Sequence, residues 1–203
     1  EEARRNDRGH RNDAVKAQIA LAVELLLMTP IRAGNLAGLS IERHLHWSRN
    51  GRKGTVHLVI PAWEVKNQEH LEFELPAETV GILESYLRDF RPRLLDCPNE
   101  YLFPGKNGEH KQRSCLATQI TGHVRESTGL EVNPHLFRHI GAKLYLDANP
   151  GGDEVCRRVL GHRSMDTTTR FYAGLEMAAA ARHFDSEILK IRRSLRDGPQ
   201  GAG

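Results

Sequence analysis

Two polar residues with complementary chemistry stand three positions apart in this 203-residue sequence: His135 and Arg138, which follow an Asn-Pro pair. Residues three apart on a helix share a face, and Pro favours the first helical position. A helix N-terminus attracts anions, and an imidazole and a guanidinium beside it would add charged hydrogen-bond donors. The spacing therefore predicts a phosphate site, although the pair alone is more typical of a surface arginine and an ordinary histidine near a helix start.

A second histidine and a tyrosine follow later in the chain. His162 comes after a glycine that is expected to end a helix, and Tyr172 stands ten residues further on. Alone, each is more typical of a loop residue or of a buried tyrosine. The other tyrosines fit a structural role better, because Tyr86 and Tyr145 lie in expected amphipathic helices and Tyr101 lies in an apolar run.

Two further cations lie earlier. Arg32 follows a long apolar helix, at a helix start that Thr29 and Pro30 are expected to cap, and it must reach a polar partner or a cleft. Lys66 lies in a polar turn between two expected strands, where a solvated lysine is the ordinary interpretation.

Taken in order, these residues resemble the active-site set of the tyrosine recombinases, the phage integrase family. The resemblance covers nearly the whole chain and is most specific over residues 134–172. The segment Tyr-Leu-Phe-Pro-Gly at 101–105 is similar to the family's usual link between its sheet and later helices. Asn35 stands where the family commonly has an acidic residue. The resemblance implies six catalytic residues: Arg32, Lys66, His135, Arg138, His162 and Tyr172.

The resemblance also implies a mechanism. The Tyr172 oxygen would attack a DNA phosphodiester, giving a 3′-phosphotyrosyl link and a free 5′-hydroxyl without ATP. Three residues would bind the scissile phosphate: Arg32, Arg138 and His162. His135 is the expected base for the tyrosine proton, and Lys66 is the expected acid for the leaving 5′-oxygen. Lys53 is the alternative hairpin lysine. No metal or other cofactor is expected.

The elements that must position these residues follow from hydrophobic periodicity. Helices are expected over residues 13–28, from about 32 to 38, and over 78–90, 113–128, 134–147, 153–160, 165–181 and 183–195. Strands are expected over 55–60 and 71–75, with a further hairpin turn at Asn50-Gly51. The expected fold is α+β, mainly α, with a small antiparallel sheet, and the resemblance implies a tyrosine-recombinase catalytic domain.

Composition and length set the remaining expectations. The net charge of +3 permits binding to nucleic acid, and three scattered cysteines argue against a disulfide framework. Residues 1–12 should be a linker or the start of the first helix, 13–197 the catalytic domain and 198–203 a disordered tail. The resemblance implies that the family's N-terminal core-binding domain is absent from this chain.

The expected partner is double-stranded DNA, bound by a tetramer of the full-length protein, while the isolated domain could be monomeric. No membrane segment is expected, and the location would be the cytoplasm, at the nucleoid, for a bacterial or phage-encoded protein. Whether the source is a phage, a mobile element or a chromosomal resolution system stays open. The target site, the direction of recombination and the docking of the C-terminal helix in cis or trans stay open.

Three other functions compete with that of a recombinase. A type IB topoisomerase shares the chemistry, and a non-catalytic DNA-binding derivative shares the fold. A zinc hydrolase is suggested by His135 and His139, four apart on a helix, but no Glu follows His135 as the metalloprotease pattern requires.

Overall fold

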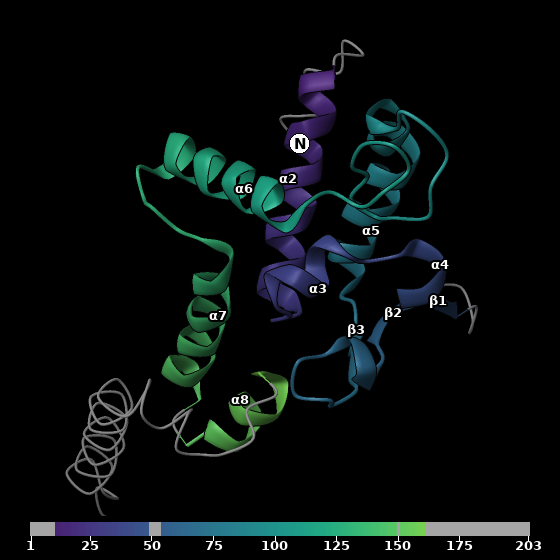
Figure 1. The fold of residues 1–203 in the computed structure, drawn as a ribbon. Coiled ribbons are helices and arrows are strands. Elements are labelled where there is room, and N and C mark those ends of the chain that lie inside the picture. The colour runs from purple at the N-terminus through teal and green to yellow at the C-terminus, as the bar shows by residue number, and fades with distance from the viewer. Residues whose placement is uncertain (1–10, 49–53, 150, 161–203) are drawn as a thin grey trace, which may run out of the picture. The chain divides into compact units, whose positions relative to one another are not determined.

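The computed structural model describes residues 11–48, 54–149 and 151–160 (Figure 1). The chain divides into two compact units, residues 1–141 and 142–203. Most described residues are helical, and three strands form one antiparallel sheet, so the predicted α+β, mainly α fold is confirmed. Within the described residues, no helix combines the length and apolar character needed to cross a membrane.

The first unit is built around helix α2 (Arg11–Met28). Three consecutive residues, Ala17, Gln18 and Ile19, are buried. Because consecutive helical residues are about 100° apart, the buried sector spans about 200°, wider than the single face predicted. The neighbours of α2 are α5 (Ala77–Ser85), the turns η2 (Tyr86–Phe90) and η3 (Arg91–Leu94), and α6 (Arg113–Thr128).

A short corner connects α2 to the sheet. Helices α3 (Ala33–Ala37) and α4 (Ile41–His44) lead into β1 (Leu45–Ser48), β2 (Thr55–Ile60) and β3 (Leu71–Glu74). The strand order is β1-β2-β3, with Leu58 of β2 opposite both Leu45 and Phe73. Alternate residues of β2 are buried, as its sequence pattern predicts. The predicted turn at Asn50-Gly51 lies outside the described residues.

The helix predicted over residues 78–90 differs in its second half. Its α-helical part ends at Ser85, the chain continues as a wide π-type turn through η2, and Pro92 lies inside the 3-10 turn η3. Proline is compatible with the first turn of a helix, because its missing N–H would have no partner there. The helix was predicted to stop before Pro92. Instead, the chain passes there from the π-type turn η2 into the 3-10 turn η3, so only the type of helical turn changes.

The segment 101–105 joins this region to the corner. Leu102 and Phe103 are fully buried, and the Leu102 N–H donates to the Leu39 carbonyl over 2.7 Å. The chain then folds back on itself: the Gly105 N–H donates to the Glu109 carbonyl over 2.8 Å. Helix α6 begins shortly afterwards and ends at Gly129, whose φ of 75° is left-handed, as the prediction for residues 113–128 required.

Helix α7 (Pro134–Ala148) begins in the first unit and continues into the second. The predicted end at residue 147 is one residue short. In the second unit the described residues include α8 (Asp153–Leu160), whose predicted bounds are confirmed. A small apolar cluster joins the two helices there, formed by Ala142, Leu146, Cys156 and Leu160. The three cysteines of the chain all lie in the described residues and form no disulfide.

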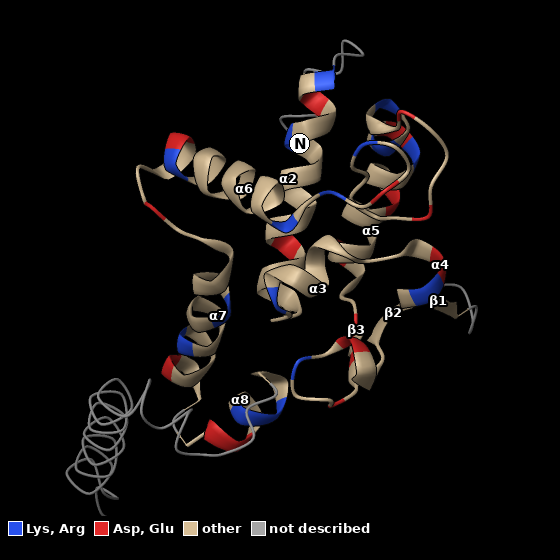
Figure 2. Ribbon diagram, viewed as in Figure 1, with Lys and Arg blue, Asp and Glu red and all other residues tan. Residues whose placement is uncertain are grey.

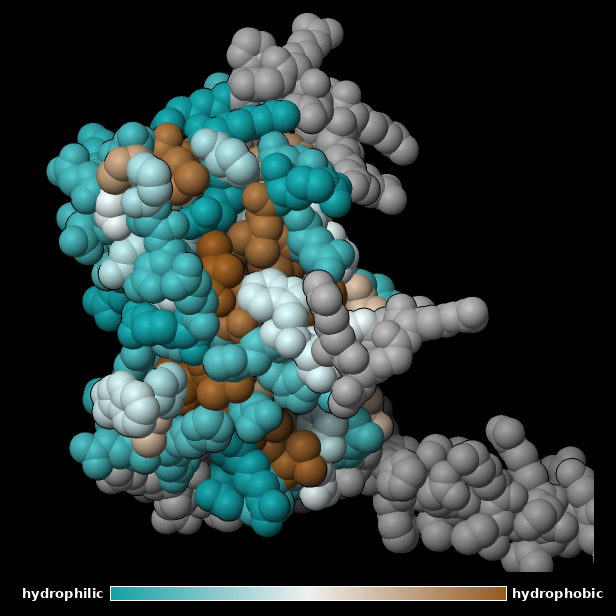
Figure 3. All heavy atoms as spheres, turned by 90° about the vertical axis from the view of Figure 1, so that its right-hand side faces the viewer, coloured by the Kyte–Doolittle hydropathy of each residue, from teal (hydrophilic) through white to brown (hydrophobic). Residues whose placement is uncertain are grey.

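The outer surface mixes polar and apolar residues. Figure 3 shows one face covered mainly by hydrophilic residues, between which hydrophobic side chains reach the surface. Basic and acidic residues are interspersed along the described elements (Figure 2). Trp63 is 82% exposed, which is unusual for a large aromatic side chain. Trp63 lines the same cavity as Arg32 and Lys66.

Two glycines should respond oppositely to the same substitution. A Cβ at Gly105 would lie 2.4 Å from the His110 carbonyl oxygen, whereas a Cβ at Gly81 in α5 would meet nothing within 4 Å. Gly105→Ala should lower the free energy of unfolding by about 1–3 kcal/mol through overpacking. Gly81→Ala should raise it by about 0.5–1 kcal/mol, because alanine favours the helix. Urea denaturation measures both, and equal effects would contradict this packing.

Candidate active site

Arg32 lies at the corner between α2 and α3. The Thr29 hydroxyl donates over 2.6 Å to the Leu25 carbonyl in the last turn of α2. The prediction that Thr29 caps the next helix is therefore wrong, because its side chain closes the preceding one. Arg32 itself occupies the N-cap position of α3 with extended backbone, next to the fully buried Ile31.

The Arg32 guanidinium reaches the turn that carries Lys66. Its Nη1 donates over 3.2 Å to Oδ1 of Asn67, the next residue after Lys66. Lys66 is exposed in the connection between β2 and β3, as predicted for the lysine of a hairpin. Arg32 and Lys66 both line a cavity of about 700 Å³. The alternative lysine, Lys53, lies outside the described residues.

Glu64, at the start of the turn that carries Lys66, is held by contacts with three other side chains. Its backbone carbonyl accepts a 2.8 Å bond from the Asn35 side chain. Its carboxylate accepts from Nη1 of Arg43 over 3.0 Å and lies 3.1 Å from Nε2 of His44. The Ser40 N–H donates to Nδ1 of His44, so Nε2 of the neutral ring carries the proton and donates to Glu64. Asn35, three residues after Arg32, thus supports the Lys66 turn.

Arg138 approaches the corner from α7. Asn133 caps this helix, because its Oδ1 accepts from the backbone N–H of His135 over 3.0 Å and of Leu136 over 3.1 Å. Arg138 is only 4% exposed, and its Nη1 donates to the Pro30 carbonyl, two residues before Arg32. The structure therefore connects Arg138, Arg32 and the Lys66 turn through two hydrogen bonds that span 108 and 35 residues of sequence.

His135 lies exposed in the first turn of α7 and faces His139. Their Nε2 atoms are 3.3 Å apart, and the ring planes meet at 87°. Partial burial lowers the pKa of His139, and the nearby charges of His135 and Arg138 lower it further. Arg138, three residues after His135 in α7, is buried while His135 is exposed, so the expected sharing of one face stays a prediction.

The remaining two predicted residues, His162 and Tyr172, lie outside the described residues. Of the other tyrosines, Tyr86 is buried and donates to the Leu102 carbonyl over 3.0 Å, as its predicted structural role requires. Tyr145 is 37% exposed, so its expected burial in an amphipathic helix is wrong.

The sequence interpretation missed several residues of this site. Asn67 holds the Arg32 guanidinium, and Trp63 and Arg113 line the cavity beside Arg32 and Lys66. Asn67 could have been found from the sequence, because it directly follows the predicted hairpin lysine, Lys66. Nothing in the local pattern marks Trp63 or Arg113, because they reach the cavity from separate elements.

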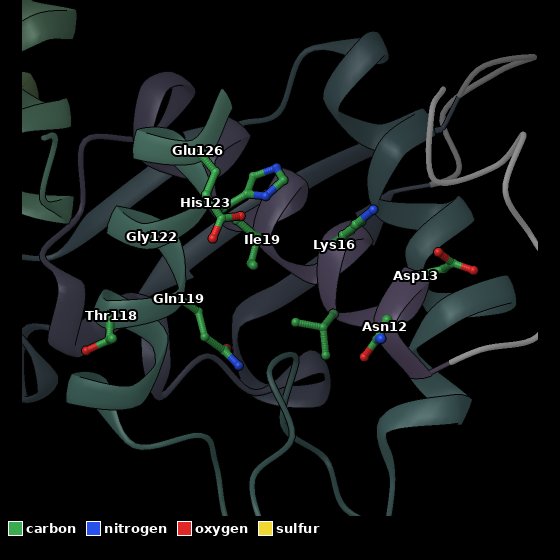
Figure 4. Close-up of a pocket in the computed structure, with 10 residues that line it drawn as sticks. Asn12, Asp13, Lys16, Ile19, Thr118, Gln119, Gly122, His123 and Glu126 are labelled. Carbon is green, nitrogen blue, oxygen red and sulfur yellow. The ribbon is translucent and has the colours of Figure 1, made fainter. Parts of the chain in front are cut away.

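A second cavity of about 670 Å³ lies between α2 and α6 and contains none of the predicted residues. Figure 4 shows Lys16 and Ile19 of α2 on one side, with Gln119 and His123 of α6 on the other. The residues that line this cavity are of mixed chemical type and do not form a recognisable catalytic group. Among the residues that the structure describes, no cluster of three or more His, Cys, Asp or Glu side chains is arranged to hold a metal ion.

Comparison with known proteins identifies the family. Residues 6–178 match the phage integrase family, which is most of the chain. The chain belongs to this family. A phage integrase relative, tyrosine recombinase XerC 2 of Ralstonia nicotianae, is 30% identical over 72% of this chain and 40% of its own length. Tyrosine recombinase XerD of Shewanella oneidensis is 27% identical over 77% of this chain and 49% of its own length. The chain thus spans less than half the length of either relative.

Solved structures of recombinases have a similar fold. The XerH site-specific recombinase in a post-cleavage complex with a palindromic difH substrate has a TM-score of 0.62 and 20% identity, covering 91% of this chain and 47% of XerH. XerA recombinase has a TM-score of 0.58 and 25% identity, covering 86% of this chain and 63% of XerA. The predicted fold, that of a tyrosine-recombinase catalytic domain, is thereby confirmed.

The His44 contacts predict a pH dependence of stability. Burial lowers the pKa of His44 below its ordinary value of about 6.5, and the Glu64 carboxylate offsets this in part. As pH falls through about 6.5, the unfolded state takes up the proton more readily than the folded state, so the free energy of unfolding decreases. Protonation of Nδ1 would also break the bond from the Ser40 N–H.

His44→Gln should therefore have two effects. It should lower the free energy of unfolding at pH 7.5 by about 1–3 kcal/mol, because a buried hydrogen-bonded group is lost. It should also flatten the decline in stability between pH 7.5 and 5.5, because the titrating group is gone. Urea denaturation across this pH range measures both, and a decline as steep as that of the wild-type chain would contradict the assignment.

Proposed function

We propose that this chain is the catalytic part of a site-specific DNA recombinase, which cuts and rejoins DNA through Tyr172. The observation that supports it most is the connection of Arg138 to the corner of Arg32, beside the Lys66 turn, in a member of the phage integrase family. These two bonds join the segments that carry three of the six residues expected to act on one phosphate, through Pro30 and Asn67. The relatives named for recombination support the same class of reaction.

Two guanidiniums suit the charge that develops at phosphorus. As the Tyr172 oxygen attacks, negative charge grows on the non-bridging oxygens, and preorganised donors stabilise it. Arg32 and Arg138 are permanently charged and can each offer paired hydrogen bonds, and His162 would add another. Much of the Arg138 environment is fixed before DNA binds, since its side chain is buried.

Proton transfer completes the reaction. A tyrosine has an ordinary pKa near 10, so a base must take its proton, and exposed His135 at the start of α7 is the proposed group. The 5′-oxygen would leave as a poor alkoxide unless it is protonated, which is the proposed role of exposed Lys66. The 3′-phosphotyrosyl bond conserves the energy of the phosphodiester, so the free 5′-hydroxyl of a partner strand can reverse the step.

The proposed substrate is double-stranded DNA, in the cytoplasm of a bacterium. Recombination joins two duplexes, so the full-length protein would act as a tetramer on DNA. Within the chain, the catalytic domain is proposed to extend over residues 13–197. Exposed Trp63 and Arg113 beside the Arg32 cavity are placed to meet the DNA next to the scissile phosphate.

Two other functions make different predictions. A type IB topoisomerase would relax supercoiled DNA as a monomer with the same Tyr172 chemistry. A non-catalytic DNA-binding derivative would bind DNA equally well with or without the Tyr172 hydroxyl. The buried Arg138, bonded to the segment that carries Arg32, favours a catalytic protein, because DNA binding alone does not require a buried arginine at this corner.

Covalent trapping tests the proposed nucleophile. A nicked suicide duplex carrying the end sequences of the encoding element, or a pool of duplexes, should give an SDS-resistant protein–DNA band at high protein concentration. Tyr172→Phe should lose the band because it keeps the ring and removes the attacking oxygen. Tyr145→Phe is the matched control, since Tyr145 is exposed in the described residues. A band that survives Tyr172→Phe and disappears in Tyr145→Phe would show that the wrong tyrosine was chosen.

A sulfur substitution in the DNA tests the role of Lys66. Lys66→Ala should slow cleavage of an ordinary phosphodiester by about 10²–10⁴-fold, the usual contribution of a general acid. A substrate with sulfur at the 5′-bridging position should restore the rate, because a thiolate leaves without a proton. Lys53→Ala is tested in parallel. Rescue of Lys53→Ala and not of Lys66→Ala would assign the proton to the other lysine.

A further inference from the structure

The paired histidines at the start of α7 form a chelating site that phosphate chemistry does not require. His135 and His139 are four residues apart, so their side chains lie on one face of the helix. The Nε2 atoms face each other at 3.3 Å. Nitrogen ligands about 2.0–2.1 Å from a tetrahedral zinc ion lie about 3.3–3.4 Å from each other, so the pair already has the spacing of two zinc ligands.

We propose that His135 and His139 together bind a divalent transition-metal ion of the zinc and copper class. Imidazole nitrogen is a preferred ligand of both ions. His135 is exposed and His139 is half-buried, so an ion can reach the pair from solvent. Water or an anion fills its other positions, because no third metal-binding side chain joins the pair among the described residues.

The rigidity of this part of α7 favours chelation. Asn133 caps the helix directly before His135, and buried Phe137 and Arg138 fix the turn between the two histidines. A ligand pair that is held in place binds an ion more tightly than two separate imidazoles do, because the second ligand is already nearby when the first binds. An ion bound by both Nε2 atoms takes the place of the hydrogen bond that joins them.

Metal at this site would have a consequence for catalysis, which rests on the proposed function. The Nε2 lone pair of His135 would be donated to the metal and could no longer accept the Tyr172 proton. The ion would therefore inhibit strand cleavage, in contrast to a catalytic zinc, and chelation of the ion would restore it. Binding itself requires neither DNA nor Tyr172.

Calorimetry with zinc alone tests the site. The full 203-residue chain, stripped with EDTA, is titrated with ZnCl₂ without DNA at pH 7.5. His139→Gln and His135→Gln should each weaken the strongest site about tenfold or more, because each leaves a single imidazole. The control is His57→Gln with His70→Gln, which removes the two histidines beside the Glu72 carboxylate on the sheet. That double variant should keep the site.

Copper EPR gives a second measurement. Copper bound to the wild-type chain at one equivalent should show hyperfine coupling to two nitrogens, reduced to one in His139→Gln. Circular dichroism verifies that each variant is folded. Unchanged zinc affinity in folded His139→Gln, or loss of the site in the sheet control, would overturn the proposal.

Cleavage assays separate the metal site from the proposed function. For each protein, covalent trapping with zinc is compared with trapping in EDTA. Zinc should reduce trapping by the wild-type chain strongly and trapping by His139→Gln less. Zinc bound at the pair with trapping unaffected would keep the metal site and overturn His135 as the base. Absence of trapping in EDTA, with zinc binding intact, would count against the proposed function alone.

Discussion

A buried guanidinium is the constraint on which this site depends. Arg138 is permanently charged yet only 4% exposed, and removing such a charge from water costs several kcal/mol unless hydrogen-bond acceptors replace the solvent. The Pro30 carbonyl is one of those acceptors. It is available because proline and the corner between α2 and α3 direct this carbonyl out of a helix. Satisfying Arg138 therefore holds the start of α7 against the segment that carries Arg32.

The second constraint acts on the Lys66 turn. A turn between β2 and β3 would ordinarily be free to move, but Glu64 at its base accepts hydrogen bonds from the elements that precede the sheet. Arg32 adds a bond to Asn67 at the other end of the turn. The turn is thus fixed at both ends while Lys66 between them stays exposed. This arrangement suits a proton donor for DNA, because the bonds at both ends fix the position of the turn while the ammonium group of Lys66 stays accessible.

Local sequence patterns predicted most helices and strands, but they did not predict the hydrogen bonds between residues that are distant in the sequence. The bounds of α6 follow from apolar periodicity and a closing glycine, which are properties of adjacent residues. Thr29 was misassigned because a hydroxyl can bond to the helix before it or after it, and the local sequence is the same in both cases. The bonds of Arg32 to Asn67 and of Arg138 to Pro30 join distant segments, so periodicity does not contain them. The residue types of the site could be predicted, but the contacts that position them could not.

Mapping the residue that carries DNA after cleavage is the most direct measurement of the central claim. The trapped complex would be digested with nuclease and trypsin, and the peptide with a residual nucleotide sequenced by mass spectrometry. The account predicts a nucleotide attached through its 3′-phosphate to the Tyr172 oxygen. A nucleotide on exposed Tyr145, on another residue, or attached through a 5′-phosphate would contradict it.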